Sequence, residues 1–205
     1  MTVKRRSYRS PARHASAGQT RARIVAAACD LLADGGKQAW SLEAVAQRAG
    51  VTRLTVYNHF ESKGGLMEAV FDDLAQKGGL SELADVFADT DPRQALRRVV
   101  SVFCGFWASH RSMLPKFRAT VLMDDEIAQT LRQRSERRRQ GLTVLVQRLM
   151  GDAGQRSADL VDVLFALTSF ETFEALSVRN RRPKAIESLL HALVEQAVSC
   201  ATAKA

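Results

Sequence analysis

Hydrophobic residues recur at helical spacing along most of the 205-residue chain. In residues 19–34 they follow the i, i+3, i+4, i+7 spacing of one apolar helix face. Longer helices are predicted at residues 92–110, 124–150, 157–178 and 184–201. The pattern predicts an all-α fold of about nine helices. We divide it into an N-terminal head, residues 19–66, and a helical body for ligand binding and dimerisation, residues 67–205.

Two short helices joined by a tight turn are predicted after residue 40. Ser41 is a suitable N-cap for a helix from about Leu42 to Ala49, and Gly50 accepts the left-handed backbone that ends such a helix. Thr52 can cap a second helix, Arg53 to His59. A helix, a short turn containing glycine and a second helix form the helix-turn-helix arrangement, whose second helix enters the major groove of DNA.

The second helix carries polar side chains on the faces that its apolar residues do not occupy. Arginine, threonine, asparagine and histidine can donate to phosphates or base edges, and tyrosine can donate or stack. We therefore predict DNA contacts from Ser41, Thr52, Arg53, Thr55, Tyr57, Asn58, His59 and Lys63. The alternative interpretation is an ordinary helical hairpin with a solvated polar face.

The run Thr55-Val56-Tyr57-Asn58-His59-Phe60, followed by Ser62-Lys63 and Leu66, resembles the signature of the TetR family of bacterial repressors. In that family the run reads roughly T-L-Y-x-H-F-x-x-K-x-x-L. The resemblance covers about residues 20–71, and beyond them only the helical pattern and the length agree. It departs at Gly64-Gly65, where the family usually has helix-forming residues. Each glycine weakens a helical turn by about 1 kcal/mol relative to alanine.

The resemblance implies a ligand-responsive, sequence-specific transcriptional regulator, a repressor that a small molecule releases from its operator. The expected partners are double-stranded operator DNA, a small-molecule effector and a second copy of the chain. Helices 157–178 and 184–201 carry more apolar positions than one face holds, and such exposed surface usually marks an interface. Two helices from each chain would form a four-helix bundle, as in TetR-like dimers.

Most of the net charge of +8 lies at the N-terminal end. Residues 1–63 hold 11 Lys/Arg and 4 Asp/Glu, a net charge of +7, whereas residues 64–205 hold 19 and 18, a net charge of +1. A basic head on a neutral body is typical of proteins that contact DNA phosphates. The composition of residues 1–18 predicts a flexible basic arm, which either orders on DNA or remains a solvated tail.

A second basic stretch lies in the helix predicted from residue 124. It contains Arg132, Arg134, Arg137, Arg138 and Arg139, with Glu136 interleaved. It could form a second nucleic-acid patch or a solvated helix face, and the interleaved acid favours the solvated face.

The body also offers material for a small-molecule pocket, because such pockets are mostly apolar with a few placed polar groups. The predicted ligand contacts are Phe103, Trp107, His110, Phe117, Arg118, Met123, Phe165, Ser169 and Thr172. The alternative is that each of these aromatic residues simply belongs to the core.

Motifs of catalysis are missing from the sequence. The four histidines are scattered without paired carboxylates, and the three cysteines lack metal-ligand spacing. We expect no enzyme activity, no metal and no cofactor. No apolar run approaches the ~20 residues of a membrane span, and no signal peptide is evident, so a cytoplasmic location is expected. The competing class is a helical small-molecule-binding or catalytic protein that its basic head only anchors to nucleic acid.

Overall fold

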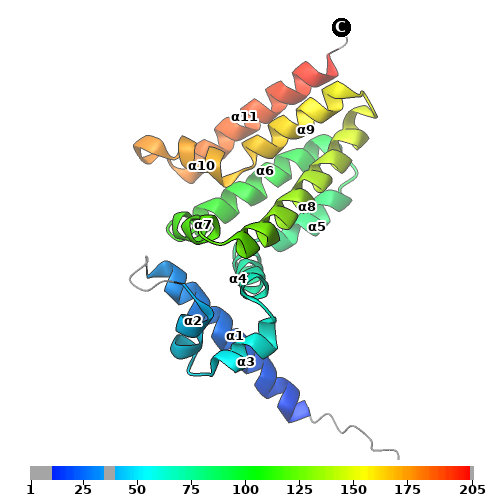
Figure 1. Cartoon of the computed structure of the whole chain (residues 1–205). Helices are drawn as coiled ribbons and strands as arrows, with labels where there is room; N and C mark the ends of the chain where they lie inside the picture. Colours follow the sequence, from blue (N-terminus) through cyan, green and yellow to red (C-terminus); the bar gives the residue numbers. More distant parts are fainter. Residues whose placement is uncertain (1–10, 35–39, 204–205) are drawn as a thin grey trace, which may run out of the picture.

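The computed structural model describes residues 11–34 and 40–203, and these residues form helices and connecting turns without a strand. Figure 1 shows a small head joined by one helix to a larger helical body. The head contains α1 (Pro11–Ala33), α2 (Leu42–Ala49) and α3 (Arg53–Phe60), and α4 (Lys63–Lys77) connects it to the body. The predicted all-α class is confirmed.

The body contains seven further α-helices and two short 3-10 helices among the described residues. They are η1 (Leu80–Glu82), α5 (Leu83–Ala88), α6 (Pro92–Ser109), α7 (Leu114–Leu122), α8 (Asp125–Met150), α9 (Gln155–Leu167), α10 (Phe170–Leu176), η2 (Val178–Asn180) and α11 (Pro183–Thr202). Residues 11–34 and 40–203 contain 11 α-helices, against about nine expected, and one source of the difference is the division of the helix expected over residues 157–178.

The first helix is longer than expected. It begins at Pro11 rather than at Gln19, so residues 11–18 of the expected arm are helical. Proline suits the first position of a helix because its missing N–H would have no partner there. The expectation for residues 1–10 lies outside the described residues.

The helix expected over residues 157–178 is divided at Thr168. The carbonyl oxygen of Thr168 accepts hydrogen bonds from Trp107 Nε1 at 3.1 Å and from Arg138 Nη1 at 2.7 Å. The amide of Thr172, its partner in a continuous helix, donates instead to Ser169 Oγ at 3.1 Å. Ser169 thereby caps the separate helix α10, and the break follows from contacts with α6 and α8.

The head is assembled as the sequence predicts. Ser41 Oγ accepts the amide of Ala44, Thr52 Oγ1 accepts the amide of Thr55, and Gly50 has φ of 64°. The apolar residues of α1, α2 and α3 are buried together, among them Ile24 and Val56 at 0% exposure. Local caps and one shared core therefore hold the helix-turn-helix in place.

The start of α4 is where the head meets the body. The backbone amide of Gly64 donates to Glu126 Oε1 on α8 at 2.7 Å. A Cβ atom at Gly64 would lie 2.8 Å from Thr130 Oγ1 and 3.0 Å from Glu126 Oε1. A Cβ atom at Gly65 would lie 2.2 Å from the carbonyl oxygen of Phe60. These are the two glycines that depart from the family signature. Gly64 lets α4 approach α8 closely, and Gly65 lets α4 approach the end of α3 closely.

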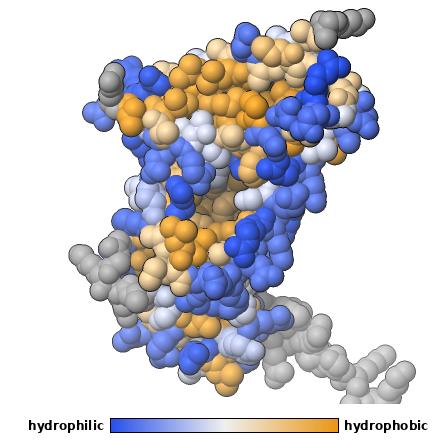
Figure 2. Space-filling view, turned by 45° about the horizontal axis from the view of Figure 1, so that its top comes forward, coloured by the Kyte–Doolittle hydropathy of each residue, from blue (hydrophilic) through white to orange (hydrophobic). Residues whose placement is uncertain are grey.

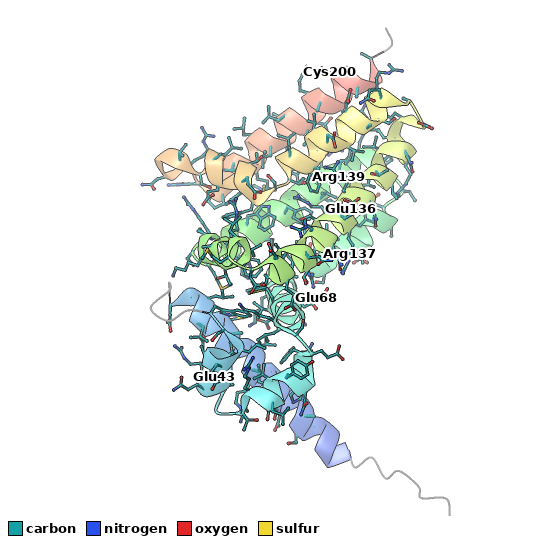
Figure 3. The ribbon with its side chains drawn as sticks, viewed as in Figure 1. Glu43, Glu68, Glu136, Arg137, Arg139 and Cys200 are labelled. Carbon is teal, nitrogen blue, oxygen red and sulfur yellow. The ribbon has the colours of Figure 1, made fainter. Side chains whose placement is uncertain are left out.

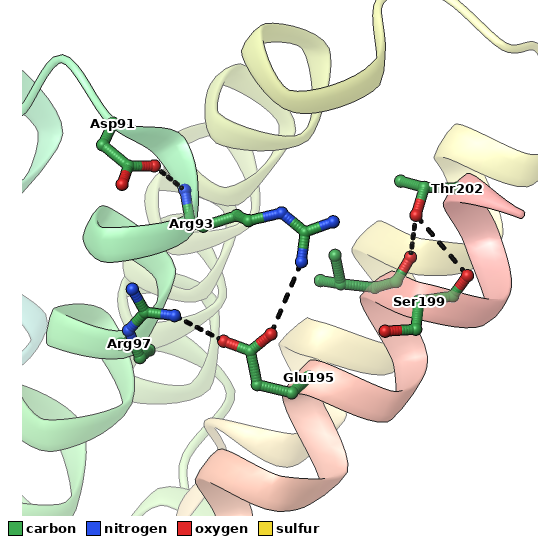
Figure 4. Close-up of polar contacts among 7 residues, drawn as sticks. Asp91, Arg93, Arg97, Glu195, Ser199 and Thr202 are labelled. Carbon is green, nitrogen blue, oxygen red and sulfur yellow. Dashed lines mark hydrogen bonds and ion pairs between the residues drawn. The ribbon is translucent and has the colours of Figure 1, made fainter.

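Helices α6, α8, α9 and α11 form the main stack of the body (Figure 1). Figure 4 shows how α11 is fixed to α6 at one side: Glu195 accepts from Arg97 Nη1 at 2.7 Å and from Arg93 Nη1 at 3.5 Å. Ile186, Leu190 and Val194 are buried at four-residue spacing on the inner face of α11. The opposite face of α11 lies at the edge of the stack (Figure 1).

Substitution of Gly65 by alanine tests the close turn between α3 and α4. The added methyl group would clash with a backbone atom that cannot simply rotate away, so Gly65→Ala should lower the free energy of unfolding by about 1–3 kcal/mol. Gly105→Ala is the matched control, because Gly105 lies inside α6 with no atom within 4 Å of the added Cβ. The control should raise stability by about 0.5–1 kcal/mol. Denaturant unfolding measures both, and equal stability of Gly65→Ala and wild type would contradict the predicted clash.

Candidate DNA interface and ligand cavity

Helix α3 presents a polar surface away from the core of the head. Thr52, Arg53, Tyr57 and Asn58 are exposed, whereas Val56 and Phe60 on the opposite side are buried. Tyr57 is 57% exposed although it is aromatic. Among the described residues, Arg53 and Asn58 make no side-chain hydrogen bond or ion pair, so their donors remain available to a ligand. This surface can reach phosphates and base edges together.

The remaining predicted DNA residues already have structural contacts. Ser41 and Thr52 use their hydroxyl oxygens to cap α2 and α3, and Thr55 Oγ1 lies 2.9 Å from Thr52 Oγ1. The ring of His59 packs beside that of Phe60, with centroids 6.1 Å apart. These half-buried or capping side chains fix the shape of the surface, while their outer atoms border it.

Lys63 lies at the head–body junction. Its ammonium group forms an ion pair with Asp124 at 2.6 Å, at the start of α8. The hydrogen bond from Lys63 is the main reason that the pKa of Asp124 lies below its ordinary value of 3.8. Lys63 therefore bridges the head to the body in this structure, at the position predicted to contact phosphate.

The arginine run of α8 is largely engaged within the chain. Arg134 pairs with Asp72 and Glu68 of α4, and Arg137 Nη2 lies 3.3 Å from Glu68 Oε1. Figure 3 labels Arg137 on α8 and Glu68 on α4. Arg139 pairs with Asp162 of α9. Neither a nucleic-acid patch nor a purely solvated face describes the run, since these arginines bind α8 to its neighbours.

A cavity of about 750 Å³ lies inside the body. Its walls come from α4, η1, α5, α6, α7, α8 and α10, and aromatic rings supply much of them. The rings are those of Phe71, Phe87, Phe103, Trp107, Phe117 and Phe170. Figure 2 shows the body hollowed, with apolar residues inside the hollow. The volume and the lining suit an organic molecule of drug-like size.

The cavity brings together four of the predicted ligand contacts: Phe103, Trp107, Phe117 and Arg118. The other five do not line it. His110 Nδ1 bonds the carbonyl of Phe106, Met123 is 89% exposed at the α7–α8 corner, and Phe165 lies under two arginines. Ser169 caps α10, and the hydroxyl of Thr172 donates to the carbonyl of Ala166.

The sequence analysis missed the charged lining of the cavity. Arg134, Arg137 and Arg138 of α8 and Asp72 of α4 all line it. Arg134 and Arg138 continue the inward stripe of α8, in which Ile127, Leu142 and Leu145 are buried. These two arginines could have been identified from the sequence, because they fall in line with the apolar residues of the helix and charged residues rarely face a core without a partner.

A polar cluster between α6 and α11 contains a serine, a histidine and a glutamate. The expectation that no histidine has a paired carboxylate is wrong here, because Glu187 and His191 are four residues apart on α11, with Nε2 of His191 3.5 Å from Oε1 of Glu187. Ser101 Oγ donates to Glu187 Oε1 at 2.6 Å, and His191 Nε2 lies 3.1 Å from Ser101 Oγ. A nucleophilic triad needs the acid on the far nitrogen of the histidine, yet His191 Nδ1 has no partner within the described residues. The cluster lies outside the cavity lining, and its geometry is that of a helix–helix contact.

In the part of the chain that the structure describes, no group of His, Cys, Asp and Glu side chains is arranged to hold a metal ion. None of the helices described is both long enough and apolar enough to cross a membrane.

Comparison with known families identifies the head. Residues 24–70 match the profile of the bacterial regulatory proteins of the tetR family. The head of the chain is a tetR-family domain. The matched range contains α2 and α3 with the exposed polar surface described above, together with the first half of α4. No curated protein sequence matches this chain significantly.

Solved structures of transcriptional regulators share the fold over about nine-tenths of the chain. A transcriptional regulator from Rhodococcus sp. RHA1 is 23% identical, with a TM-score of 0.60, and the match covers 90% of this chain and 99% of that one. NalD, the secondary repressor of the MexAB-OprM multidrug efflux pump in Pseudomonas aeruginosa, is 20% identical, with a TM-score of 0.64 and coverage of 89% and 96%. A TetR transcription regulator from Haloarcula marismortui is 15% identical, with a TM-score of 0.61 and coverage of 89% and 98%. At these identities the likeness establishes the fold.

Replacing Asp124 by asparagine tests the ion pair at the junction. Asparagine caps a helix as well as aspartate does, so Asp124→Asn removes the charge and keeps the cap of α8. The half-buried pair should contribute about 0.5–1 kcal/mol. Because the folded-state pKa is lowered, this contribution is complete above pH 3.8 and is lost as the pH falls through the folded value.

The free energy of unfolding of wild type and Asp124→Asn should therefore differ near pH 7, and the difference should shrink as the pH falls below 3.8. Asp125→Asn is the control, because Asp125 is exposed and has no ion-pair partner among the described residues. A difference for Asp124→Asn that does not change with pH would show that the charge of Asp124 does not stabilise the junction.

Proposed function

We propose that this TetR-family protein is a homodimeric, sequence-specific DNA-binding regulator, a repressor that a small molecule releases from its operator. It acts in the cytoplasm on a near-palindromic operator, with half-sites about one helical turn apart, ~34–36 Å. This proposal rests mainly on the helix-turn-helix, which lies within the segment that matches the family profile. Its second helix exposes Arg53, Tyr57 and Asn58.

The concentration of positive charge in residues 1–63 supports DNA as the partner, because phosphate contacts provide most of the non-specific affinity. The competing class is a catalytic protein that its head only anchors to nucleic acid, and no arrangement among the described residues of the body supports it. The ordered Ser101 cluster and the arginine-lined cavity have structural or binding geometry instead. Binding and release therefore account for the described residues better than turnover does.

Helices α9 and α11 provide the proposed dimer face. Figure 2 shows apolar surface gathered at the top of the body, where α11 and α9 lie in Figure 1. Val163 on α9 is 43% exposed and Leu193 on α11 is 41% exposed. Leu189, Leu193 and Ala197 follow one another at four-residue spacing beside the buried stripe of α11. Two such pairs of helices can pack as a four-helix bundle and bring two heads to one operator.

Helix α4 links the cavity to the head. Phe71 and Asp72 of α4 line the cavity, and the first residues of the same helix carry the Lys63 and Gly64 contacts. A ligand that binds more tightly when α4 is displaced shifts the heads away from the spacing that the operator requires. The loss of operator affinity then equals the differential affinity of the ligand for the two states.

The DNA-binding part of the proposal is tested by selecting DNA from a randomised library with the purified full-length protein. Wild type should enrich a two-fold symmetric motif, which footprinting should confirm. Arg53→Ala should weaken binding to this motif by about 1–3 kcal/mol and relax one base preference in each half-site, since arginine is suited to reading guanine.

Two further variants are controls for this selection. Lys63→Ala should weaken binding to all sequences by similar factors, because a contact to phosphate or to Asp124 reads no base. Arg48→Ala removes an exposed arginine that pairs with Asp34 and should leave the base profile unchanged. An unchanged profile for Arg53→Ala with an altered one for Lys63→Ala would reverse the assigned roles. No enriched motif with wild type would overturn the proposed function.

The dimer face is tested by placing a charge on it. Leu193→Glu should convert the dimer into a monomer, because a carboxylate would be buried in apolar surface without a partner. Leu54→Glu is the matched control: Leu54 is 67% exposed on α3, far from this face, and its variant should remain dimeric. Sedimentation velocity distinguishes the two states. An unchanged sedimentation coefficient for Leu193→Glu would place the interface elsewhere.

A further inference from the structure

We propose that the effector is an amphipathic organic anion, a mostly apolar molecule whose single carboxylate binds Arg138 inside the cavity. This inference deepens the proposed function, on which it rests for the regulatory role of the ligand. It depends on the contacts of Arg138, on the pairing of the other charges in the cavity and on the apolar character of the walls.

The guanidinium of Arg138 has only part of its hydrogen-bonding capacity satisfied. Nη1 donates to the carbonyl oxygen of Thr168 at 2.7 Å and lies 3.5 Å from the Thr168 hydroxyl. Nη2 and Nε donate to no acceptor among the described residues, and neither is sealed in the core. An arginine carries five N–H donors in a planar fork. The side of the fork that Nη2 and Nε form therefore remains available to a ligand.

Aromatic rings leave the edge of this guanidinium as its open side. The ring centroid of Phe165 lies 4.0 Å from Arg138 Cζ and that of Phe103 lies 5.5 Å from it. These contacts fix the plane of the group by cation–π attraction. A planar carboxylate matches the edge of a fixed guanidinium through two parallel hydrogen bonds.

Arg138 is also the cavity arginine without a carboxylate in ion-pair contact within the described part of the chain. Arg118 pairs with Glu171 at 3.2 Å and with Glu174 at 3.5 Å. Arg134 and Arg137 pair with acids of α4. Two acids line the cavity, Asp72 and Glu171, against four arginines, and Glu68 and Glu174 pair with arginines of the lining from outside it. The ion pairs of the described residues thus leave Arg138 as the lining arginine to which an anion is attracted.

Burial lowers the pKa of Arg138 to about 10, so the group stays charged at neutral pH in a partly dehydrated site. A buried charge is stabilised chiefly by a close partner of opposite sign, and a ligand carboxylate supplies one. The remaining lining is dominated by phenylalanine, leucine and valine side chains with Trp107, which suits the apolar remainder of such a molecule.

The test compares acids with their uncharged isosteres on the wild-type dimer. The probes are 2-naphthoate, 4-phenylbutyrate and octanoate, each beside its primary amide, with binding measured by isothermal titration calorimetry without DNA. At least one acid should bind roughly 10- to 100-fold more tightly than its amide, the range expected for hydrogen bonds to a charged group. The fluorescence of Trp107, which lines the cavity, should change on binding.

Substitutions then assign the preference to particular residues. Arg138→Gln should remove the difference between acid and amide, whereas Arg132→Gln, at an exposed position of the same helix outside the cavity lining, should preserve it. Glu171→Gln removes a negative charge from the lining at a side chain that is 60% exposed, and it should strengthen acid binding several-fold. Glu174→Gln, which also loses a partner of Arg118 but lies outside the lining, should strengthen it less.

The wild-type comparison and Glu171→Gln keep the inference testable even if Arg138→Gln does not fold. Equal affinity for every acid and its amide, or no acid binding below about 1 mM, would overturn the proposed anion site. Unchanged acid preference in a folded Arg138→Gln would overturn the role of Arg138. The DNA selection is independent of these measurements, so an enriched operator with no acid preference would leave the regulatory function standing and remove only this inference.

Discussion

The position of the DNA-binding surface depends on how the start of α4 meets the start of α8. Gly64 donates its backbone amide to Glu126, and the adjacent Lys63 pairs with Asp124, two residues before Glu126 on the same corner of the body. Both acids lie where the dipole of α8 already favours negative charge. Because α4 also contributes the buried Leu66 to the core, this corner of the body is joined to the base of the head by one helix.

Along its length, α4 is held to α8 by charge as well as by packing. Arg134 reaches the acids of α4 and its guanidinium lies 4.6 Å from the ring centroid of Phe71. Phe71 in turn lines the cavity. Helix α4 therefore contributes both to the cavity wall and to the connection with the head, so a single helix joins the proposed ligand site to the proposed DNA surface. Thermodynamic coupling between two sites requires an element with two arrangements that both sites bias, and under the proposed function α4 is that element.

The parts of the structure that local chemistry determines were predictable from the sequence. Ser41, Gly50 and Thr52 act within one turn of themselves, and the observed caps and left-handed backbone follow from their side chains. The division of the helix at Thr168 was not predictable, because Trp107 and Arg138 approach from other helices to bind its carbonyl oxygen. A helical pattern in sequence contains no information about such distant donors.

The sequence predicted that the body contains a cavity, but it predicted only some of the residues that line it. Phe103, Trp107 and Phe117 were identified because bulky apolar residues on several helices suggested a pocket. Arg138 was assigned to a solvated face because its neighbours in sequence are charged, yet it occupies the inward stripe of α8. The charged composition of the run suggested that Arg138 is exposed. Its position in the helical repeat, in line with the buried Ile127 and Leu142, indicates instead that it faces inward.

The absence of a side chain at Gly64 also limits how far this head is interchangeable with others. A Cβ atom there would lie 2.8 Å from Thr130 Oγ1 and 3.0 Å from Glu126 Oε1, two side-chain atoms of α8. A head carrying an ordinary side chain at this position would have to turn these two side chains aside, and turning Glu126 away would break its hydrogen bond with the amide of residue 64. An exchange of heads with related regulators would therefore keep this contact only if the residues at positions 126 and 130 were exchanged as well.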